Sequence, residues 1–322
     1  MMNEPSLNEN STLAELAAYF LYYVVKDCYV NSTYQAYKAR LNNHVLPELG
    51  TVRVKDLKKL DVQNLIFGLS NQDVPVSAHT SRLVKSILNR ILDYAVDIEI
   101  IDRNVAQRIM LPKEVKYQPR IYTKGEIINL LDAAKDTFLH IPVLLAVKTG
   151  LRRSEILALQ WSDISLENKS ITVRKTIAGR SLNGPKTKYS QRCFQPPDAV
   201  LSALRSYWNE QKRLDAKRED VISGKAFVVG KDDGSSYNPS YMSRKFNELL
   251  KANNLPAIRF HDLRHAYATY AHENGMNVKE LSLSLGHNSA ATTLDNYVHL
   301  RDEYAVIRSI NRMIRERREK NA

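Results

Sequence analysis

The chain has 322 residues, of which 43% are hydrophobic and 25% charged, with 11 Gly and 11 Pro. This is the composition of a globular protein long enough for two domains, and it excludes a disordered, collagenous or disulfide-stapled chain. Because no apolar run approaches the ~20 residues of a bilayer crossing and no signal peptide is recognisable, we expect a cytoplasmic protein with no membrane partner. The two cysteines, Cys28 and Cys193, are too few for a disulfide framework or a cysteine zinc site, and we expect both to pack as small apolar groups.

The charge balance indicates a polyanionic partner. Lys and Arg number 47 against 35 Asp and Glu, a net charge of +12. The excess is uneven, because residues 1–120 carry 15 basic and 13 acidic side chains whereas residues 121–322 carry 32 and 22. Such an excess is typical of proteins that neutralise nucleic-acid phosphates, although charge alone leaves a merely basic surface open.

The first third of the chain predicts a tail over residues 1–10 and a compact helical domain over residues 11–108. Thr12 stands three residues before Glu15, the spacing of a capping box at the start of a helix. Apolar spacing and turn residues predict four helices, over residues 13–24, 33–45, 60–69 and from about 77 to 95. The following segment, 109–122, contains two prolines and no period, which indicates an extended linker.

The remainder predicts a second, mainly helical domain over residues 123–300. Thr123 and Glu126 repeat the capping-box spacing, and the apolar stretch 141–159 reads as two helices separated at Thr149-Gly150. A small antiparallel hairpin is expected from strands at 170–177 and 188–194, with a turn over 179–185. Further helices are expected near 198–219, 238–252, 262–273, 277–285 and 290–299, and then a basic C-terminal helix within residues 301–322.

Four stretches of this second domain concentrate unusual polar groups: TGLRRSE (149–155), GPKTKYSQR (184–192), HDLRH (261–265) and LGHNSAATTLDNYVHL (285–300). Each stretch alone is weak evidence for a catalytic site, because such arginines and lysines more often cap helices or lie at the surface. Together they supply two arginines, a lysine, two histidines and a tyrosine, with no carboxylate or cysteine cluster at metal-ligand spacing.

That inventory suits the cleavage of a phosphodiester without metal. Two guanidinium forks can stabilise the extra negative charge on the pentavalent phosphorus. A tyrosine hydroxyl, with an ordinary pKa of about 10, can attack once a neutral histidine takes its proton, and a lysine can protonate the departing oxygen. The first step would leave a covalent phosphotyrosine, which conserves the bond energy for rejoining.

These residues carry a resemblance to the tyrosine recombinases, the phage-integrase and Xer group. The family order Arg, Lys, His-x-x-Arg, His or Trp, Tyr is matched by Arg152, Lys186, His261, Arg264, His287 and the nucleophile Tyr297, with Glu155 as the supporting acidic residue. Arg153 and Lys188 remain alternatives for the first arginine and the lysine. His265 and His299 are expected to support the fold or helix ends, and Trp161 to pack in the core.

The resemblance implies a mainly α catalytic domain with a small antiparallel sheet, preceded by a helical core-binding domain over 11–108 with which it would clamp duplex DNA. It implies a homotetramer on double-stranded recombination sites, a 3′-phosphotyrosyl intermediate, a Holliday junction, no cofactor and no metal. Accessory DNA-bending or directionality proteins are possible partners, the C-terminal helix would dock in trans, and an arm-site domain is not expected. A non-catalytic DNA-binding regulator and a type IB topoisomerase are the alternatives.

Overall fold

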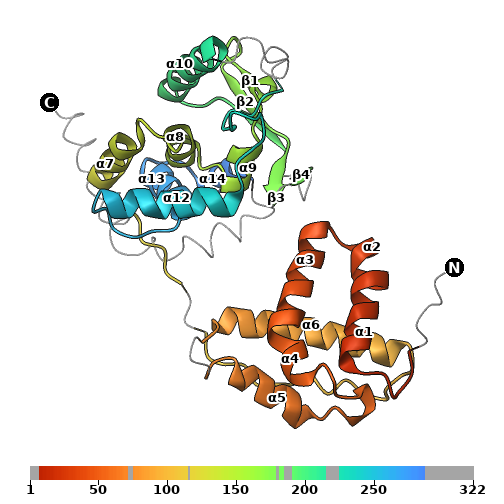
Figure 1. Cartoon of the computed structure of the whole chain (residues 1–322). Helices are drawn as coiled ribbons and strands as arrows, with labels where there is room; N and C mark the ends of the chain where they lie inside the picture. Colours follow the sequence, from red (N-terminus) through yellow and green to blue (C-terminus); the bar gives the residue numbers. More distant parts are fainter. Residues whose placement is uncertain are drawn as a thin grey trace. The chain divides into compact units, whose positions relative to one another are not determined.

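The computed structural model describes residues 7–71, 75–114, 117–178, 181–184, 191–214 and 225–286. The chain divides into two compact units, residues 1–117 and 118–322, which are drawn in Figure 1 and are described separately below. Both units are mainly helical, and the second also carries short antiparallel strands, as the predicted fold class requires. No helix in the described ranges is long and apolar enough to span a membrane.

The first unit is built around two long helical segments, each of which continues through a π-helical stretch. The first comprises α1 (Leu13–Tyr19), η1 (Phe20–Val25) and α2 (Lys26–Cys28), and the second comprises α3 (Asn31–Arg40), η2 (Leu41–Val45) and α4 (Leu46–Leu49). The predicted capping box is present, with the Thr12 hydroxyl accepting from the Glu15 N–H at 3.2 Å and Glu15 accepting the Thr12 N–H at 2.8 Å. Local sequence therefore fixes where the first segment starts.

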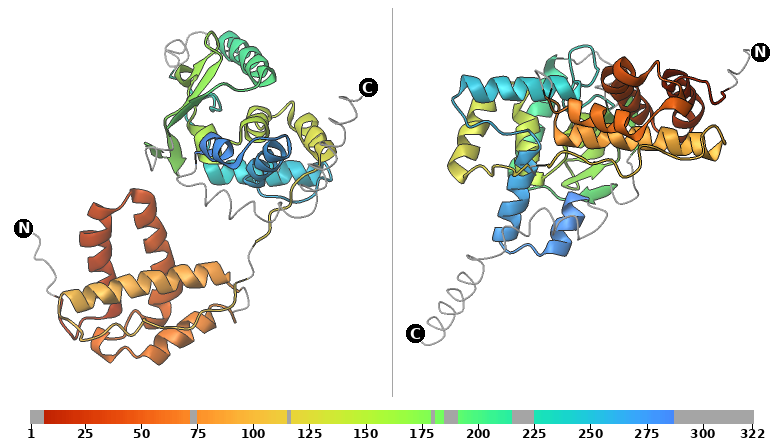
Figure 2. Two further views of the ribbon diagram at one scale, coloured as in Figure 1. Left: turned by 180° about the vertical axis from the view of Figure 1, so that it is seen from behind. Right: turned by 90° about the horizontal axis from the view of Figure 1, so that it is seen from below.

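A further group of helices completes this unit. It comprises η3 (Val54–Asp56), α5 (Lys59–Gly68) and α6 (Ala78–Asp97), the last capped by the Ser77 side chain. Figure 1 shows the two segments side by side and crossing α6, and the same arrangement is seen from behind in Figure 2. Leu88, Ile91 and Leu92 of α6 are fully buried, so this helix supplies the centre of the first core.

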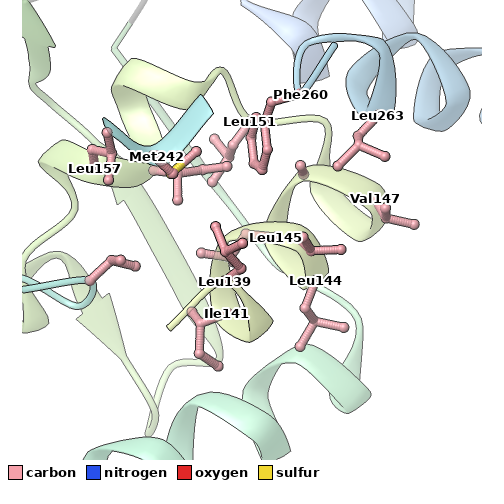
Figure 3. Close-up of a cluster of buried hydrophobic side chains, with 14 of the residues drawn as sticks. Leu139, Ile141, Leu144, Leu145, Val147, Leu151, Leu157, Met242, Phe260 and Leu263 are labelled. Atoms are coloured by element: carbon pink, nitrogen blue, oxygen red, sulfur yellow. The ribbon is translucent and has the colours of Figure 1, made fainter. Parts of the chain in front are cut away.

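The α-helices of the second unit pack against α8 or against helices that contact α8. Their bounds are α7 (Lys124–Ala134), α8 (His140–Thr149), α9 (Arg153–Ala158), η4 (Trp161–Asp163), α10 (Asp198–Leu214), α12 (Pro239–Ala252), α13 (Asp262–Glu273) and α14 (Val278–Leu285). Thr123 and Glu126 form the predicted capping box of α7. Almost every side chain of α8 is buried, and Figure 3 shows its Leu144, Leu145 and Val147 within the apolar core. Trp161 is buried too, as predicted.

Residues 171–173 pair antiparallel with residues 192–194, as predicted, but the described residues form more strands than the predicted single hairpin. β2 (Ser170–Val173) pairs antiparallel with both β1 (Ile164–Ser165) and β5 (Arg192–Phe194), in the order β1-β2-β5. β3 (Thr176–Ala178) instead pairs with β4 (Ser181–Asn183), so residues 181–183 are a strand and the predicted turn over 179–185 is too long. β3 and β4 are consecutive in the chain and hydrogen-bond to each other. β2 pairs instead with β5, which follows both of them in the chain.

The cysteines lie at the surface, and several predicted site residues lie outside the described part of the chain. Both cysteines are exposed, so the prediction that they pack as apolar groups is wrong; Cys28 ends a surface helix and Cys193 lies on the outward face of β5. Several predicted features lie outside the described residues: Lys186, Lys188, His287, Tyr297, His299, the helix 290–299 and the C-terminal helix within 301–322.

Candidate active site

The turn between α8 and α9 positions the first arginine. Gly150 ends α8 in the left-handed region, at φ 65°, and a Cβ placed there would lie 2.4 Å from a ring carbon of Tyr267. Only glycine satisfies both the backbone conformation and this close approach. The chain then becomes extended at Arg152, which occupies the N-cap of α9. The helix end at Thr149-Gly150 thus changes the direction of the chain, so that Arg152 lies outside the core.

Glu155 holds Arg152 in place and is itself held by Arg192 of β5. The Glu155 carboxylate accepts the Arg152 backbone N–H at 2.8 Å and its Nη1 at 2.7 Å. On its other side it accepts Nη1 and Nη2 of Arg192 at 3.2 and 2.9 Å. Burial alone would raise the pKa of Glu155, but hydrogen bonds and charge from Arg192 and Arg152 overcome this and lower it to about 2. Glu155 is therefore a buried carboxylate at every physiological pH.

Arg264 joins the same turn to the end of α14. Arg264 is 2% exposed. Its Nη1 donates to the Gly150 carbonyl at 2.6 Å, and its Nη2 donates to the Leu285 carbonyl at 2.7 Å. Arg152 reaches the next carbonyl, that of Gly286, at 3.0 Å. The two guanidinium groups thus converge on adjacent backbone carbonyls, although they come from positions more than a hundred residues apart.

His261 lies one helical turn before Arg264, at the N-cap of α13. Its ring meets that of His265 edge to face, with centroids 5.2 Å apart and an interplanar angle of 87°. The residue keeps an exposed surface, yet burial of the imidazole, followed by the nearby His265 and Arg264, lowers the pKa of His261 to about 4. The imidazole is therefore neutral at pH 7 and able to accept a proton.

Two of these residues, Arg152 and His261, open onto a cavity of about 510 Å³. Arg152 and His261 line it together with Arg153, Ser154, Ser243, Asn247, Arg259 and Phe260. The walls come from the start of α9, the face of α12 and the segment before α13. Within the described ranges no cluster of three or more His, Cys, Asp or Glu is gathered as metal ligands. The lining instead offers guanidinium, hydroxyl and amide donors, which are groups that bind phosphate oxygens.

The structure brings together four of the residues that the sequence singled out, namely Arg152, Glu155, His261 and Arg264. It also distinguishes the adjacent arginines, because Arg152 pairs with Glu155 whereas Arg153 donates to Ser243 of α12. Sequence reasoning missed Arg192, whose side chain is only 9% exposed. Arg192 ends the polar stretch 184–192, so its position could have indicated it, but only the lysines of that stretch were predicted to be site residues.

Known proteins share this architecture. The model of the phage integrase family matches residues 120–304, and that of the phage integrase N-terminal SAM-like domain matches residues 12–70. A "Tyrosine recombinase XerC-like" protein of Caldanaerobacter subterraneus subsp. tengcongensis is 27% identical over 315 residues, covering 91% of this chain and 80% of the relative.

Two solved structures show the same fold at low sequence identity. The Tn1549 transposon integrase in complex with a circular intermediate DNA aligns with a TM-score of 0.78 at 19% identity, covering 94% of this chain and 99% of that one. A lambda integrase tetramer bound to a Holliday junction aligns with a TM-score of 0.68 at 18% identity, covering 88% and 79%. Fold and family models together define a DNA strand-transferring class of enzyme. The chain belongs to the phage integrase family and is a tyrosine recombinase.

Proposed function

We propose that this chain is a site-specific recombinase that cuts and rejoins DNA through a 3′-phosphotyrosyl intermediate at Tyr297, integrating or excising a mobile element. The observation that carries the proposal is the convergence of Arg152 and Arg264 on the carbonyls of Leu285 and Gly286, beside the neutral His261. Two guanidinium groups fixed on adjacent carbonyls, with Arg152 lining the cavity, suit a phosphate that gains negative charge as it is attacked.

In the proposed reaction the tyrosine oxygen attacks the scissile phosphorus and the 5′-oxygen of the following nucleotide leaves. His261 accepts the tyrosine proton, because its lowered pKa keeps it unprotonated at pH 7. Arg152 and Arg264 stabilise the non-bridging oxygens, and Lys186 protonates the leaving oxygen, with Lys188 as the alternative donor. His287 assists at the same phosphate. The reverse sequence, with a 5′-hydroxyl from another strand, rejoins the DNA without ATP, cofactor or metal.

The partners follow from the relatives. The Tn1549 enzyme was solved with a circular intermediate DNA and the lambda enzyme as a tetramer on a Holliday junction. We therefore propose double-stranded recombination sites as the substrate and a homotetramer on DNA as the active form, with residues 11–108 as a core-type DNA-binding domain, residues 109–122 as the linker, residues 123–300 as the catalytic domain and residues 301–322 as a docking helix.

The test is a search for covalent protein–DNA adducts on a library of nicked duplexes with randomised centres. Wild type should become linked to the 3′ end of a subset of sequences, which identifies the site. Tyr297→Phe should bind the recovered site and form no adduct, because the ring remains while the attacking oxygen is gone.

Tyr304→Phe is the matched control and should behave as wild type. Adducts from Tyr297→Phe would assign the nucleophile elsewhere. Binding by wild type without any adduct would favour a non-catalytic regulator, and relaxation of supercoils without recombination would favour a topoisomerase.

A further inference from the structure

Arg153 lines the cavity but has no role in the reaction proposed above. It follows Arg152 directly, yet its side chain leaves toward α12, where its Nη1 donates to the Ser243 hydroxyl. Consecutive residues at the start of α9 thus send two guanidinium groups to different parts of one wall. The sequence alone presents them only as competitors for a single role.

The electrostatic setting of Arg153 differs from that of the other cavity arginines. Arg152 is paired with Glu155 at 2.7 Å, and Arg259 with Asp262 at 3.0 Å. Arg153 forms no ion pair with any residue in the described ranges, and it donates there to the neutral hydroxyl of Ser243. Burial lowers the pKa of its guanidinium, which shows that the charge is partly withdrawn from water. A half-buried cation without a carboxylate is favourable when an anion binds beside it.

The neighbouring groups complete a set of anion-binding donors. The Ser243 oxygen accepts from Arg153, which leaves its own O–H to donate. Asn247 follows Ser243 by four residues on α12, so its amide lies on the same face of the helix and lines the same cavity. Ser154 adds a second hydroxyl from α9. Ser243 and Asn247 come from α12, whereas the carbonyls that hold Arg152 and Arg264 belong to residues 150, 285 and 286.

We propose that Arg153, with Ser243 and Asn247, forms a second phosphate subsite that binds the DNA phosphate next to the scissile one on the same strand. This inference rests on the proposed function. A strand presents one phosphate every ~3.4 Å of helix axis, so a cavity that receives the reacting phosphate also meets its neighbour. Binding two successive phosphates fixes the direction of the strand in the site, which a single phosphate contact leaves open.

The experiment measures DNA binding with each flanking phosphate replaced in turn by an uncharged methylphosphonate. It uses full-length protein carrying Tyr297→Phe, so that binding is separated from cleavage, and the duplex recovered in the adduct selection. Without a further change, neutralising the adjacent phosphate should weaken binding about tenfold, the effect of losing one charged hydrogen bond. With Arg153→Gln added, the same replacement should cost nothing further, whereas replacements elsewhere should keep their full effect.

Arg213→Gln is the matched control, since it removes one arginine charge from an exposed pair with Glu210 on α10. It should leave the whole methylphosphonate profile unchanged. Arg153→Lys keeps the charge and should retain part of the coupling, which separates lost anion binding from misfolding. A profile of Arg153→Gln identical to that of the parent at every flanking phosphate would overturn the subsite.

A second readout does not depend on the recombination site. On a duplex of unrelated sequence, the slope of log affinity against log salt should fall by about 0.9 for Arg153→Gln and stay unchanged for Arg213→Gln. If no covalent adduct is ever recovered, the proposed function fails while this slope still decides the subsite. If adducts form normally and the slope and profile of Arg153→Gln match those of the parent, the subsite alone fails.

Discussion

The two units of the chain differ in whether they bury charged side chains. In the described part of the first unit the buried polar side chains are Ser11, Ser81 and Asn104, none of them charged. The second unit buries Glu155, Asp163, Asp262 and Arg264. Burying ions carries a desolvation cost that pairing only partly returns, so such groups are weak evidence for stability and good evidence for a site. The first unit is organised for packing and the second for holding charge in place.

Removing Arg264 should produce the largest effect. Arg264→Ala should slow single-turnover cleavage by roughly 3–4 kcal/mol of transition-state stabilisation, the effect of losing a preorganised donor. It should also destabilise the second unit, because the carbonyls of Gly150 and Leu285 lose their donor, at ~1–3 kcal/mol each. Arg264→Lys keeps the charge but cannot reach both carbonyls, and should remain slow. Near-normal cleavage by either variant would show that Arg264 has no role in catalysis.

Acid should act on the second unit through Glu155. Its pKa is about 2 in the folded chain against an ordinary 4.5, so its contribution is complete above pH 4.5 and is lost as the pH falls toward 2. The difference corresponds to about 3 kcal/mol. Glu155→Gln should lower the free energy of unfolding at pH 7 and flatten its decline between these pH values in chemical denaturation. Glu210→Gln, in an exposed pair on α10, should leave that decline as steep as in wild type.

A hydrogen-bonded network around Asn104 in the first unit should respond less. The Asn104 amide donates to the Asn89 carbonyl at 2.9 Å and to Asp93 at 2.7 Å, and its oxygen accepts the Ala106 N–H at 2.7 Å. Asn104→Ala should lower the free energy of unfolding of the first unit by about 2 kcal/mol. Single-turnover cleavage by DNA-saturated protein should be unchanged, and a large loss of cleavage rate would mean that the units are not chemically separate.

The smallest effect should be the same in both units. Thr12→Ala and Thr123→Ala each remove the side-chain half of a capping box, and each should cost about 1 kcal/mol in thermal or chemical unfolding. Serine at either position should restore most of that loss. Unequal costs would show that tertiary surroundings, rather than the local motif, set the strength of these caps.

Sequence determined the features whose partners lie a few residues apart. Capping boxes at Thr12 and Thr123 and the break at Gly150 were all predictable, because each depends on neighbouring backbone groups and on one residue type. Resemblance to the family also identified Arg152, Glu155, His261 and Arg264 as members of one site. For Lys186, His287 and Tyr297 the assignments remain predictions from the sequence.

Tertiary structure alone decided the contacts that span the chain. Arg264 bonds to a carbonyl 114 residues earlier, and Arg192 of β5 donates from both Nη atoms to Glu155, 37 residues before it in the chain. The lowered pKa of His261 arises in the same way, from burial and from charges assembled around the ring. Local spacing specifies helix ends and residue types, whereas desolvation and the direction of a guanidinium depend on which distant groups the fold brings within hydrogen-bonding distance.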